Sequence, residues 1–336
     1  MKLPALIVSD LHLTANPADE YRWGLFPWLA KQVGLSQFNS VAILGDLTDA
    51  KDYHSAELVN RVVTQIVILT WLGIDVYILM GNHDYLKGGH AFFQFLNEMP
   101  RVKFITSLLD TSAQGAACVW LPHSKNPARD WKGYDLSHFQ YVFMHQTIKG
   151  AKASNGQIMD GEELPDLSAA GKVYSGDIHV PQIIGPVEYV GSPYHVHFGD
   201  RFRPRCIALY EEGPKDLHYP SINRVTVDVL GVDDLARERL HAGDQVKVRA
   251  HLQQSELHEW LAIRRSLAKI LEDKKVSCHG IELVAPKKIE RVQVAGVARV
   301  SSPARAIASF VEREDWGGDM LHTGLELLGA SDLPPA

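Results

Sequence analysis

The chain has 336 residues, of which 46% are hydrophobic and 22% charged, and its formal net charge is −6. These proportions are typical of a globular protein of about two domains, and they exclude a chain-wide basic field for nucleic acid, although not a local basic groove. Cys118, Cys206 and Cys278 are far apart and form no CxxC pair. A disulfide framework and a thiolate zinc site are therefore not predicted, and we expect a reducing, cytoplasmic location.

Short apolar runs that end in glycine or polar residues predict strands along the first two-thirds of the chain. The run that ends at Val8 is too short for a signal-peptide core and predicts the first strand. The predicted strands cover 5–8, 41–44, 76–80, 118–121, 141–144, 173–175, 183–190 and 207–210, with a helical pattern over 56–72. Strands that alternate with helices predict an α/β fold, and the short later connections predict a partly antiparallel or mixed sheet.

The longest apolar stretch, residues 62–80, is interrupted by Gln65, Gly73 and Asp75. It predicts a buried helix that ends near Gly73 and a buried strand from Asp75, and not a membrane span. We therefore expect no membrane partner.

The sequence pattern changes near residue 222. Residues 224–230 and 245–252 alternate as strands do, and helical patterns cover 233–240 and 257–271, with a last helix that begins at Ser302-Pro303. This pattern predicts a separate α+β domain. We divide the chain into 1–222, 223–316 and a short tail, 317–336, in which Gly317-Gly318 is a hinge and 320–328 a candidate partner-docking helix.

Five strand ends in the first domain carry metal-ligand residue types. They are Asp10-Leu-His12, Gly45-Asp46-Leu-Thr-Asp49, Gly81-Asn82-His83-Asp84, His145 and Gly176-Asp177-Ile-His179. A single such motif could merely cap a turn, but five at the carboxyl ends of strands predict one shared site. Mixed Asp, Asn and His donors suit Mn²⁺, Fe²⁺ or Zn²⁺, and they suffice for two ions. Two ions about 4 Å apart can hold both oxygens of a phosphoryl displacement, so the ligands predict phosphoester hydrolysis.

The series DxH, GDxxD, GNHD, a lone His and GDIH resembles the signature of calcineurin-like metallophosphoesterases, whose last motif is normally GHxH. The segments 176–182, Gly191-Ser-Pro193 and Phe198-Gly-Asp200 are similar to those of SbcD-type nucleases of double-strand-break repair. The resemblance implies an αββα two-sheet sandwich flanked by helices, with a smaller α+β capping domain. It also implies a DNA exonuclease or endonuclease that acts at DNA ends by a two-metal mechanism with a metal-activated water.

The resemblance also implies roles for single residues. Asp10, His12, Asp46 and His179 would hold one metal, and Asp46 would bridge to a second that Asn82, His145 and Asp177 complete. His83 would face the scissile phosphate, with Asp84 fixing its ring, and His54 is a candidate helper whose alternative is a plain surface histidine. Asp177 replaces a histidine of the family pattern, but a carboxylate is a competent ligand, so we expect Mn²⁺, with Mg²⁺, Fe²⁺ or Zn²⁺ as alternatives.

Loops that follow the motif strands contain candidate DNA-binding residues: Arg22, Lys51, Tyr53, Lys87, Lys125, Arg129 and Lys149. Residues 261–305 hold ten basic and four acidic residues, a local charge of +6 that is either a phosphate-tracking surface or an ordinary solvated face.

The resemblance implies a homodimer and an SbcC-like coiled-coil ATPase partner. The chain has no GxxxxGK[ST] phosphate loop, so any ATP dependence must come from such a partner. The short tail leaves independent action open. Two other functions remain as alternatives: a phosphatase or phosphodiesterase for a small phosphoester, and a non-catalytic scaffold of the same fold.

Overall fold

The computed structural model describes residues 1–86, 90–162 and 167–284, and beyond them only residues 307, 308, 310–312, 321–323 and 325. The chain divides into two compact units, Met1–Ala285 and Pro286–Ala336. The described residues of the second unit are helical, in keeping with the helices expected after Ser302-Pro303 and within 320–328. Ser302, Pro303, the glycine pair at 317 and 318, and Met320 lie outside the described residues.

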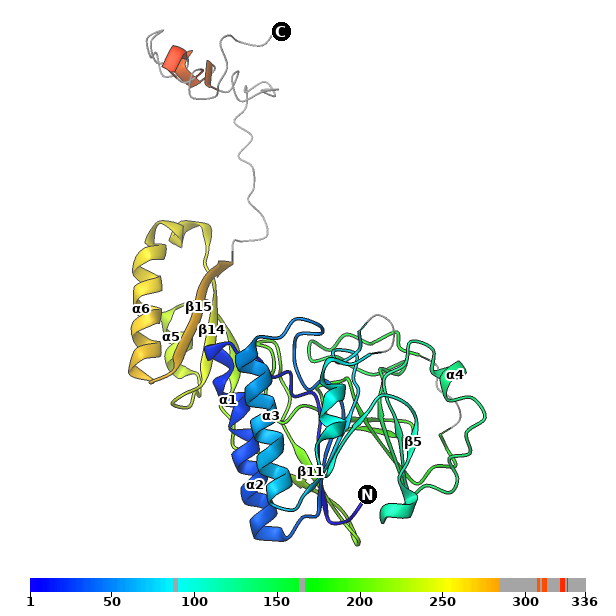
Figure 1. Ribbon diagram of the computed structural model, residues 1–336. Coiled ribbons are helices and arrows are strands. Elements are labelled where there is room, and N and C mark those ends of the chain that lie inside the picture. The colour runs from blue at the N-terminus through cyan, green and yellow to red at the C-terminus, as the bar shows by residue number, and fades with distance from the viewer. Residues whose placement is uncertain are drawn as a thin grey trace. The chain divides into compact units, whose positions relative to one another are not determined.

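The first sheet of the larger unit is mixed, in the order β12-β11-β1-β2-β3-β4. Its parallel strands are β1 (Ala5–Val8), β2 (Ser40–Ile43), β3 (Asp75–Leu79) and β4 (Val102–Ile105), and its antiparallel edge is formed by β11 (Cys206–Tyr210) and β12 (Gly213–Leu217). Helices α2 (Leu25–Ser36) and α3 (Ala56–Trp71) pack on one face (Figure 1). Helix α3 begins where the Ser55 side chain accepts from the amide of Leu58, and it buries Val62, Ile66 and Leu69 against the sheet.

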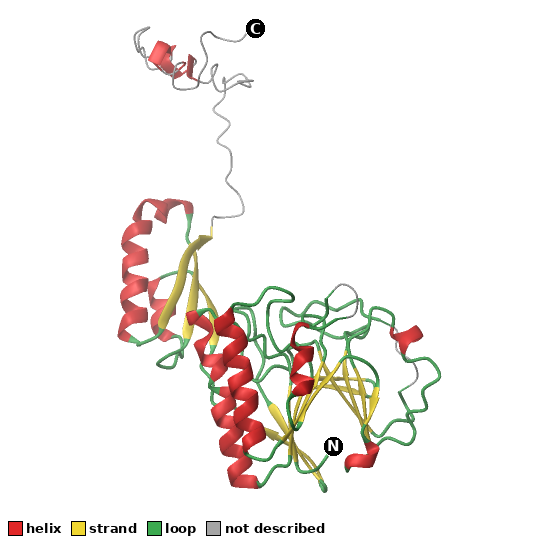
Figure 2. Cartoon of the chain, in the orientation of Figure 1, coloured by secondary structure: helices red, strands yellow, loops and turns green. Residues whose placement is uncertain are grey.

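The second sheet has the order β5-β6-β7-β8-β10-β9. Strands β6 (Cys118–Leu121), β7 (Tyr141–His145), β8 (Lys172–Gly176) and β10 (Val187–Tyr189) are parallel, while β5 (Leu109–Asp110) and β9 (Gln182–Ile184) pair antiparallel at the two edges. Its outer face is covered mainly by loops that bury Trp131, Leu136 and Phe139, together with the one-turn helix α4 (Pro127–Asp130) (Figure 2).

The two sheets pack face to face on a buried aromatic layer. Tyr77 of β3 stacks on Trp120 of β6 at 5.0 Å, and Trp120 stacks on Phe143 of β7 at 4.5 Å. Along β1, Ala5 and Ile7 belong to this layer, whereas Leu6 and Val8 face the helices. A strand that is covered on both faces needs an apolar side chain at every position, which explains the unbroken apolar run. The predicted α/β two-sheet sandwich is confirmed.

A third, three-stranded sheet of β13 (Arg224–Val229), β14 (Gln245–His251) and β15 (Ser277–Val284) follows within the same unit. Its strands are all parallel, because α5 (Val232–Arg237) and α6 (Trp260–Asp273) serve as crossovers between them. Val227, Val248 and Leu267 lie in its core. The sheet begins close to the predicted boundary at residue 222, and the domain limits 1–222, 223–316 and 317–336 stay a prediction.

The remaining elements are short: η1 (Pro17–Asp19), α1 (Glu20–Trp23), η2 (Phe92–Glu98), η3 (Ser112–Gln114) and η4 (Gln254–Glu259). Among the residues that the structure describes, no helix has the length and apolar character needed to cross a membrane.

Candidate metal centre

The motif residues of the two sheets meet at one edge of the sandwich. Asp10 and His12 follow β1, while Asp46 and Asn82 follow β2 and β3 in the same sheet. His145 ends β7 and Asp177 follows β8 in the other sheet. His and Asp side chains form three overlapping groups whose ligand atoms lie within 4.8 Å of one another: Asp10 with His12 and His179, His12 with Asp46 and His83, and Asp10 with Asp46 and His145. The predicted assembly of the five motifs into one place is therefore what the fold produces.

The first half of the centre is built on His12. Its Nε2 lies 3.1 Å from Nε2 of His179 and 3.4 Å from Oδ2 of Asp46. Oδ2 of Asp10 is buried and accepts no hydrogen bond from any residue that the structure describes. Ring nitrogens that face each other beside an unpartnered carboxylate oxygen are an unfavourable arrangement, unless a cation lies between them. These four residues fit one metal ion.

The second half is built on His145. Its Nδ1 donates to the carbonyl oxygen of Leu44 at 2.7 Å, which leaves Nε2 with a free lone pair. That nitrogen lies 3.3 Å from Oδ1 of Asn82, 3.4 Å from Oδ1 of Asp46 and 3.7 Å from Oδ1 of Asp177. The other oxygen of Asp177 accepts from the hydroxyl of Thr147. Asp177 thus points inward, as the expected ligand role requires, and the centre fits a second ion.

Glycine at the strand ends makes room for the His145 ring. A Cβ on Gly45 would lie 2.1 Å from Nδ1 of His145, and one on Gly176 would lie 2.7 Å from the same atom. Glycine is therefore favoured at these two positions, because a side chain at either one would collide with the histidine at the end of β7.

Strained backbone accompanies the ligands. Asp10, His12, Asp46 and Asp177 all have positive φ, at 54°, 43°, 51° and 85°. Such conformations are costly for residues with a Cβ and concentrate at functional sites. The strain turns each side chain away from the strand direction and into the shared edge.

Burial gives the centre unusual acid–base properties. Burial raises the pKa of Asp10 to about 7. Burial and the neighbouring Asp84 raise the pKa of Asp46 as well. Burial lowers the pKa of His12 to about 3 and that of His179 to about 4. Neutral imidazoles beside carboxyl groups that resist ionisation are the donor set that a divalent cation stabilises.

His83 lies at the edge of the centre but is held differently from the prediction. Its ring is 4.7 Å from that of His12, and its Nδ1 donates to the backbone oxygen of Asp49 at 2.6 Å. The expectation that Asp84 fixes this ring is wrong. The buried Asp84 carboxylate instead accepts from the amides of Gly81, Asp46 and Leu47, at 2.8, 2.9 and 3.2 Å, and so ties two ligand loops together.

His54, the predicted helper, packs among aromatic side chains. Its ring lies 4.2 Å from that of Phe92, and Nε2 is 2.8 Å from the hydroxyl of Thr48. These contacts give it a structural role, and a catalytic one stays a prediction.

The predicted DNA-binding residues divide into several groups. The prediction that Arg22 contacts DNA is wrong, because Arg22 is only 3% exposed and pairs with Asp19. Lys51, Tyr53, Lys125, Arg129 and Lys149 are exposed, whereas Lys87 and, from the second basic stretch, Lys287, Lys288, Arg291, Arg299 and Arg305 lie outside the described residues.

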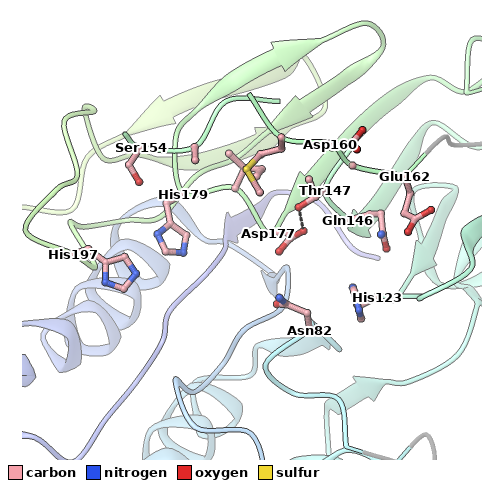
Figure 3. A pocket seen from close by; sticks show the side chains of 14 residues that line it. Asn82, His123, Gln146, Thr147, Ser154, Asp160, Glu162, Asp177, His179 and His197 are labelled. Carbon is pink, nitrogen blue, oxygen red and sulfur yellow. Dashed lines mark hydrogen bonds between the residues drawn. The ribbon is translucent and has the colours of Figure 1, made fainter. Parts of the chain in front are cut away.

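Two cavities open beside the centre, and both include Asn82 and His123 in their walls. One, of about 500 Å³, is lined by Asp177, His179 and His197 (Figure 3). The other, of about 890 Å³, is lined by Lys51, Lys125 and Tyr85. Tyr85 was not considered for the site from the sequence. His123 and His197 were considered as residues that line it, but the preferred interpretation of each was an exposed or satisfied histidine. His197 stacks on His179 at 5.5 Å, and a strand-end position after Pro122 was the one signal for His123.

Comparison with known proteins agrees with this geometry. Residues 3–164 match the calcineurin-like phosphoesterases. The chain is also 22% identical over 216 residues to "Exonuclease subunit 1" of Enterobacteria phage T4, a match that covers 61% of this chain and 64% of that protein. The chain thus spans less than two thirds of the length of this relative.

Proton release should accompany metal binding at this centre. Because the pKa of Asp10 in the metal-free protein is about 7, Mn²⁺ must displace a proton below that pH but finds the carboxylate ionised above it. The imidazoles contribute little, since their pKa values are already low. We expect calorimetry in two buffers of different ionisation enthalpy to show proton release from Asp10 near pH 6, to which Asp46 adds because its pKa is raised too, and less release near pH 8.5, where Asp10 is already ionised. Equal release at both values would contradict the raised pKa.

Replacement of Asp177 tests the second half of the centre. Asp177→Ala removes an oxygen 3.7 Å from Nε2 of His145. We expect turnover of a chromogenic phosphodiester to be lost at low Mn²⁺ and partly restored by excess Mn²⁺. Asp160→Ala is the matched control, because this exposed carboxylate lines the same cavity. Unchanged turnover in Asp177→Ala would exclude Asp177 as a ligand.

Proposed function

We propose that this protein, whose residues 3–164 match the calcineurin-like phosphoesterases, is a two-metal nuclease that hydrolyses phosphodiester bonds at DNA ends. The observation that carries the proposal is the large cavity beside the ligand set, which shares Asn82 with the centre and is lined by Lys51, Lys125 and Tyr85. Cations and an exposed aromatic face are the means by which proteins hold a single strand without reading its sequence.

The ligand residues position the reaction. Asp10, His12, Asp46 and His179 would hold one ion, and Asp46, Asn82, His145 and Asp177 the other. Two bound divalent ions supply a nucleophile from water and stabilise the charge of the phosphate oxygens. The ion identity that we propose is Mn²⁺, because the donors are oxygen and imidazole nitrogen without thiolate.

His83 is proposed to act on the leaving oxygen. With Nδ1 donating to Asp49, Nε2 is the ring nitrogen that remains for the substrate. As an imidazolium, His83 would donate a hydrogen bond from Nε2 to the phosphate and then transfer a proton to the departing alkoxide. The amide of His83 donates to Oδ1 of Asp46 at 2.9 Å, which couples its position to the bridging ligand.

The distribution of charge favours one direction for the bound strand. Nζ of Lys125 lies 5.1 Å from the Tyr85 ring centroid, so the cation and the ring form one surface. The smaller cavity presents Asp160 and Glu162, and its described lining contains no lysine or arginine. We therefore propose that the sugar-phosphate backbone of the bound strand lies along the cavity that Lys51 and Lys125 line.

The third sheet offers a further basic surface. Arg264 and Arg265 of α6, with His279 of β15, line a cavity of about 620 Å³. This lining supports the expected phosphate contacts of residues 261–305 for the part that the structure describes.

Partner proteins are proposed on two grounds. The relative from phage T4 is by name one subunit of an exonuclease, which supports an SbcC-like ATPase partner for this chain. The C-terminal ends of α2 and α3 expose Leu35, Ile68, Trp71 and Leu72, and such a patch supports the expected homodimer.

The proposal is tested by hydrolysis of an end-labelled DNA duplex and of its single strand in Mn²⁺. We expect progressive shortening of the DNA, and loss of at least about a hundredfold in rate for His83→Ala, because one positioned proton donor contributes about that factor. A chromogenic phosphodiester is assayed in parallel. Intact DNA beside turnover of the small ester would move the assignment to a small-molecule phosphodiesterase, and no turnover of either would favour a scaffold.

Tyr85 separates DNA binding from chemistry. Tyr85→Ala removes a stacking surface, and stacking on one base corresponds to roughly tenfold in KM for single-stranded DNA. We expect that rise without a comparable change in turnover of the small phosphodiester, which has no neighbouring nucleotide to stack on the ring. Tyr85→Phe keeps the ring and should behave as the unmodified protein does. An equal loss on both substrates would contradict the stacking role.

A further inference from the structure

A buried network of hydrogen bonds connects the third sheet to the metal centre. The guanidinium of Arg224, the first residue of β13, donates to the carboxylate of Asp19 and, at 2.7 Å, to the carbonyl oxygen of Val196. Arg22 donates to the same oxygen of Asp19 at 3.1 Å and to the carbonyl oxygen of His12. Two arginines thus share one carboxylate, and the far end of the chain of contacts is the backbone of a metal-ligand residue.

The network is nearly inaccessible to water. The side chains of Arg22, Asp19 and Arg224 are only 4%, 7% and 10% exposed. The aromatic rings of Tyr21 and Phe198 cover Arg224, at 5.3 and 5.0 Å from its guanidinium carbon. Two cations and one anion leave an excess positive charge in a buried place. Buried ion pairs contribute little net stability compared with apolar residues of the same size, so stability alone is a poor explanation for this arrangement.

The backbone that the network reaches is under strain. Asp10 and His12 have positive φ. The three consecutive carbonyl groups of the loop each accept a side-chain hydrogen bond: Asp10 from Ser192 at 3.1 Å, Leu11 from Tyr194 at 2.6 Å, and His12 from Arg22. Ser192 and Tyr194 come from the same segment as Val196, whose carbonyl oxygen also accepts from Arg22 at 3.2 Å. Arg22 is linked to the third sheet through Asp19, which it shares with Arg224. A strained loop keeps its shape only while these bonds hold it.

We propose that Arg224 is a positioning residue for the metal centre: through Asp19 and Arg22 it fixes the backbone of His12, so that the third sheet and the metal site that includes His12 are coupled. Direct hydrogen bonds join the four residues of this path, Arg224, Asp19, Arg22 and His12. Gln245 of β14 strengthens the junction by accepting from Nε of Arg224 at 2.8 Å and donating to the carbonyl oxygen of Ala18 at 2.5 Å. The inference depends on the proposed metal centre and not on the identity of the substrate.

Metal affinity is the measurement that separates positioning from folding. Arg224→Met keeps the length of the side chain but removes its charge and donors. We expect Mn²⁺ titration followed by electron paramagnetic resonance to show one of the two ions bound about tenfold more weakly, since outer residues that orient ligands have effects of that size. The other ion, held by Asn82 and His145, should bind as before.

Two further variants act as controls. Val248→Ala weakens the core of the same sheet without touching the network, so it should lower the Tm and leave both Mn²⁺ affinities unchanged. Arg224→Lys keeps the charge and replaces the guanidinium with a single ammonium nitrogen that can still donate to Asp19, so its effect should be smaller than that of Arg224→Met. In Asp19→Asn the Arg224→Met change should add little, because both act through one carboxylate.

The outcomes distinguish this inference from the proposed function. If both Arg224 variants fold and bind two Mn²⁺ ions with unchanged affinity, the network is only structural and the proposal is overturned. If the unmodified protein binds no Mn²⁺, the centre and the coupling both fail. A protein whose Mn²⁺ affinity depends on Arg224 but which leaves DNA intact supports the coupling and overturns the nuclease assignment alone.

Discussion

The carboxylate of Asp46 stands where the two sheets meet, and its burial sets the conditions for the rest of the molecule. Its oxygens lie 3.4 Å from Nε2 of His12 and 3.4 Å from Nε2 of His145, one from each sheet. A buried carboxylate is unfavourable without a positive charge nearby. Divalent ions satisfy this requirement, and the glycines, the strained backbone and the Asp84 hydrogen bonds are the devices that keep the donors close.

The sandwich supplies the rigidity that such a site needs. The stack of Tyr77, Trp120 and Phe143 joins β3, β6 and β7 immediately behind the strand ends that carry Asn82 and His145. Close-packed cores transmit small displacements and resist gradual deformation. Two sheets that are locked in this way can hold ligands from both at a fixed separation, whereas loops on one sheet alone could not.

Sequence reasoning identified the Asp and His residues that the fold brings together and misjudged residues around them, for one physical reason. Asp10, Asp46, Asn82 and Asp177 follow directly from strand ends, where the local pattern already fixes the direction of the chain. Arg22 was predicted as a DNA contact because it is a cationic residue that follows a motif strand in the sequence. Its environment is created by Asp19, Val196 and Arg224, the last 202 positions away along the sequence. Asp84 was assigned to its neighbour His83, although its partners are amides of two different loops.

The sequence by itself determined the alternation of strands and helices, the α/β class and the set of metal-ligand residue types, because periodicity and strand-end motifs are local properties of the chain. The two-sheet sandwich was implied only by the family resemblance. Only the tertiary structure decided which ring nitrogens face each other, that Gly45 and Gly176 lie against the ring of His145, and that the third sheet is parallel. Those features depend on contacts between segments far apart in sequence. The same contacts bury Arg22, and burial raises the pKa of Asp10 to about 7.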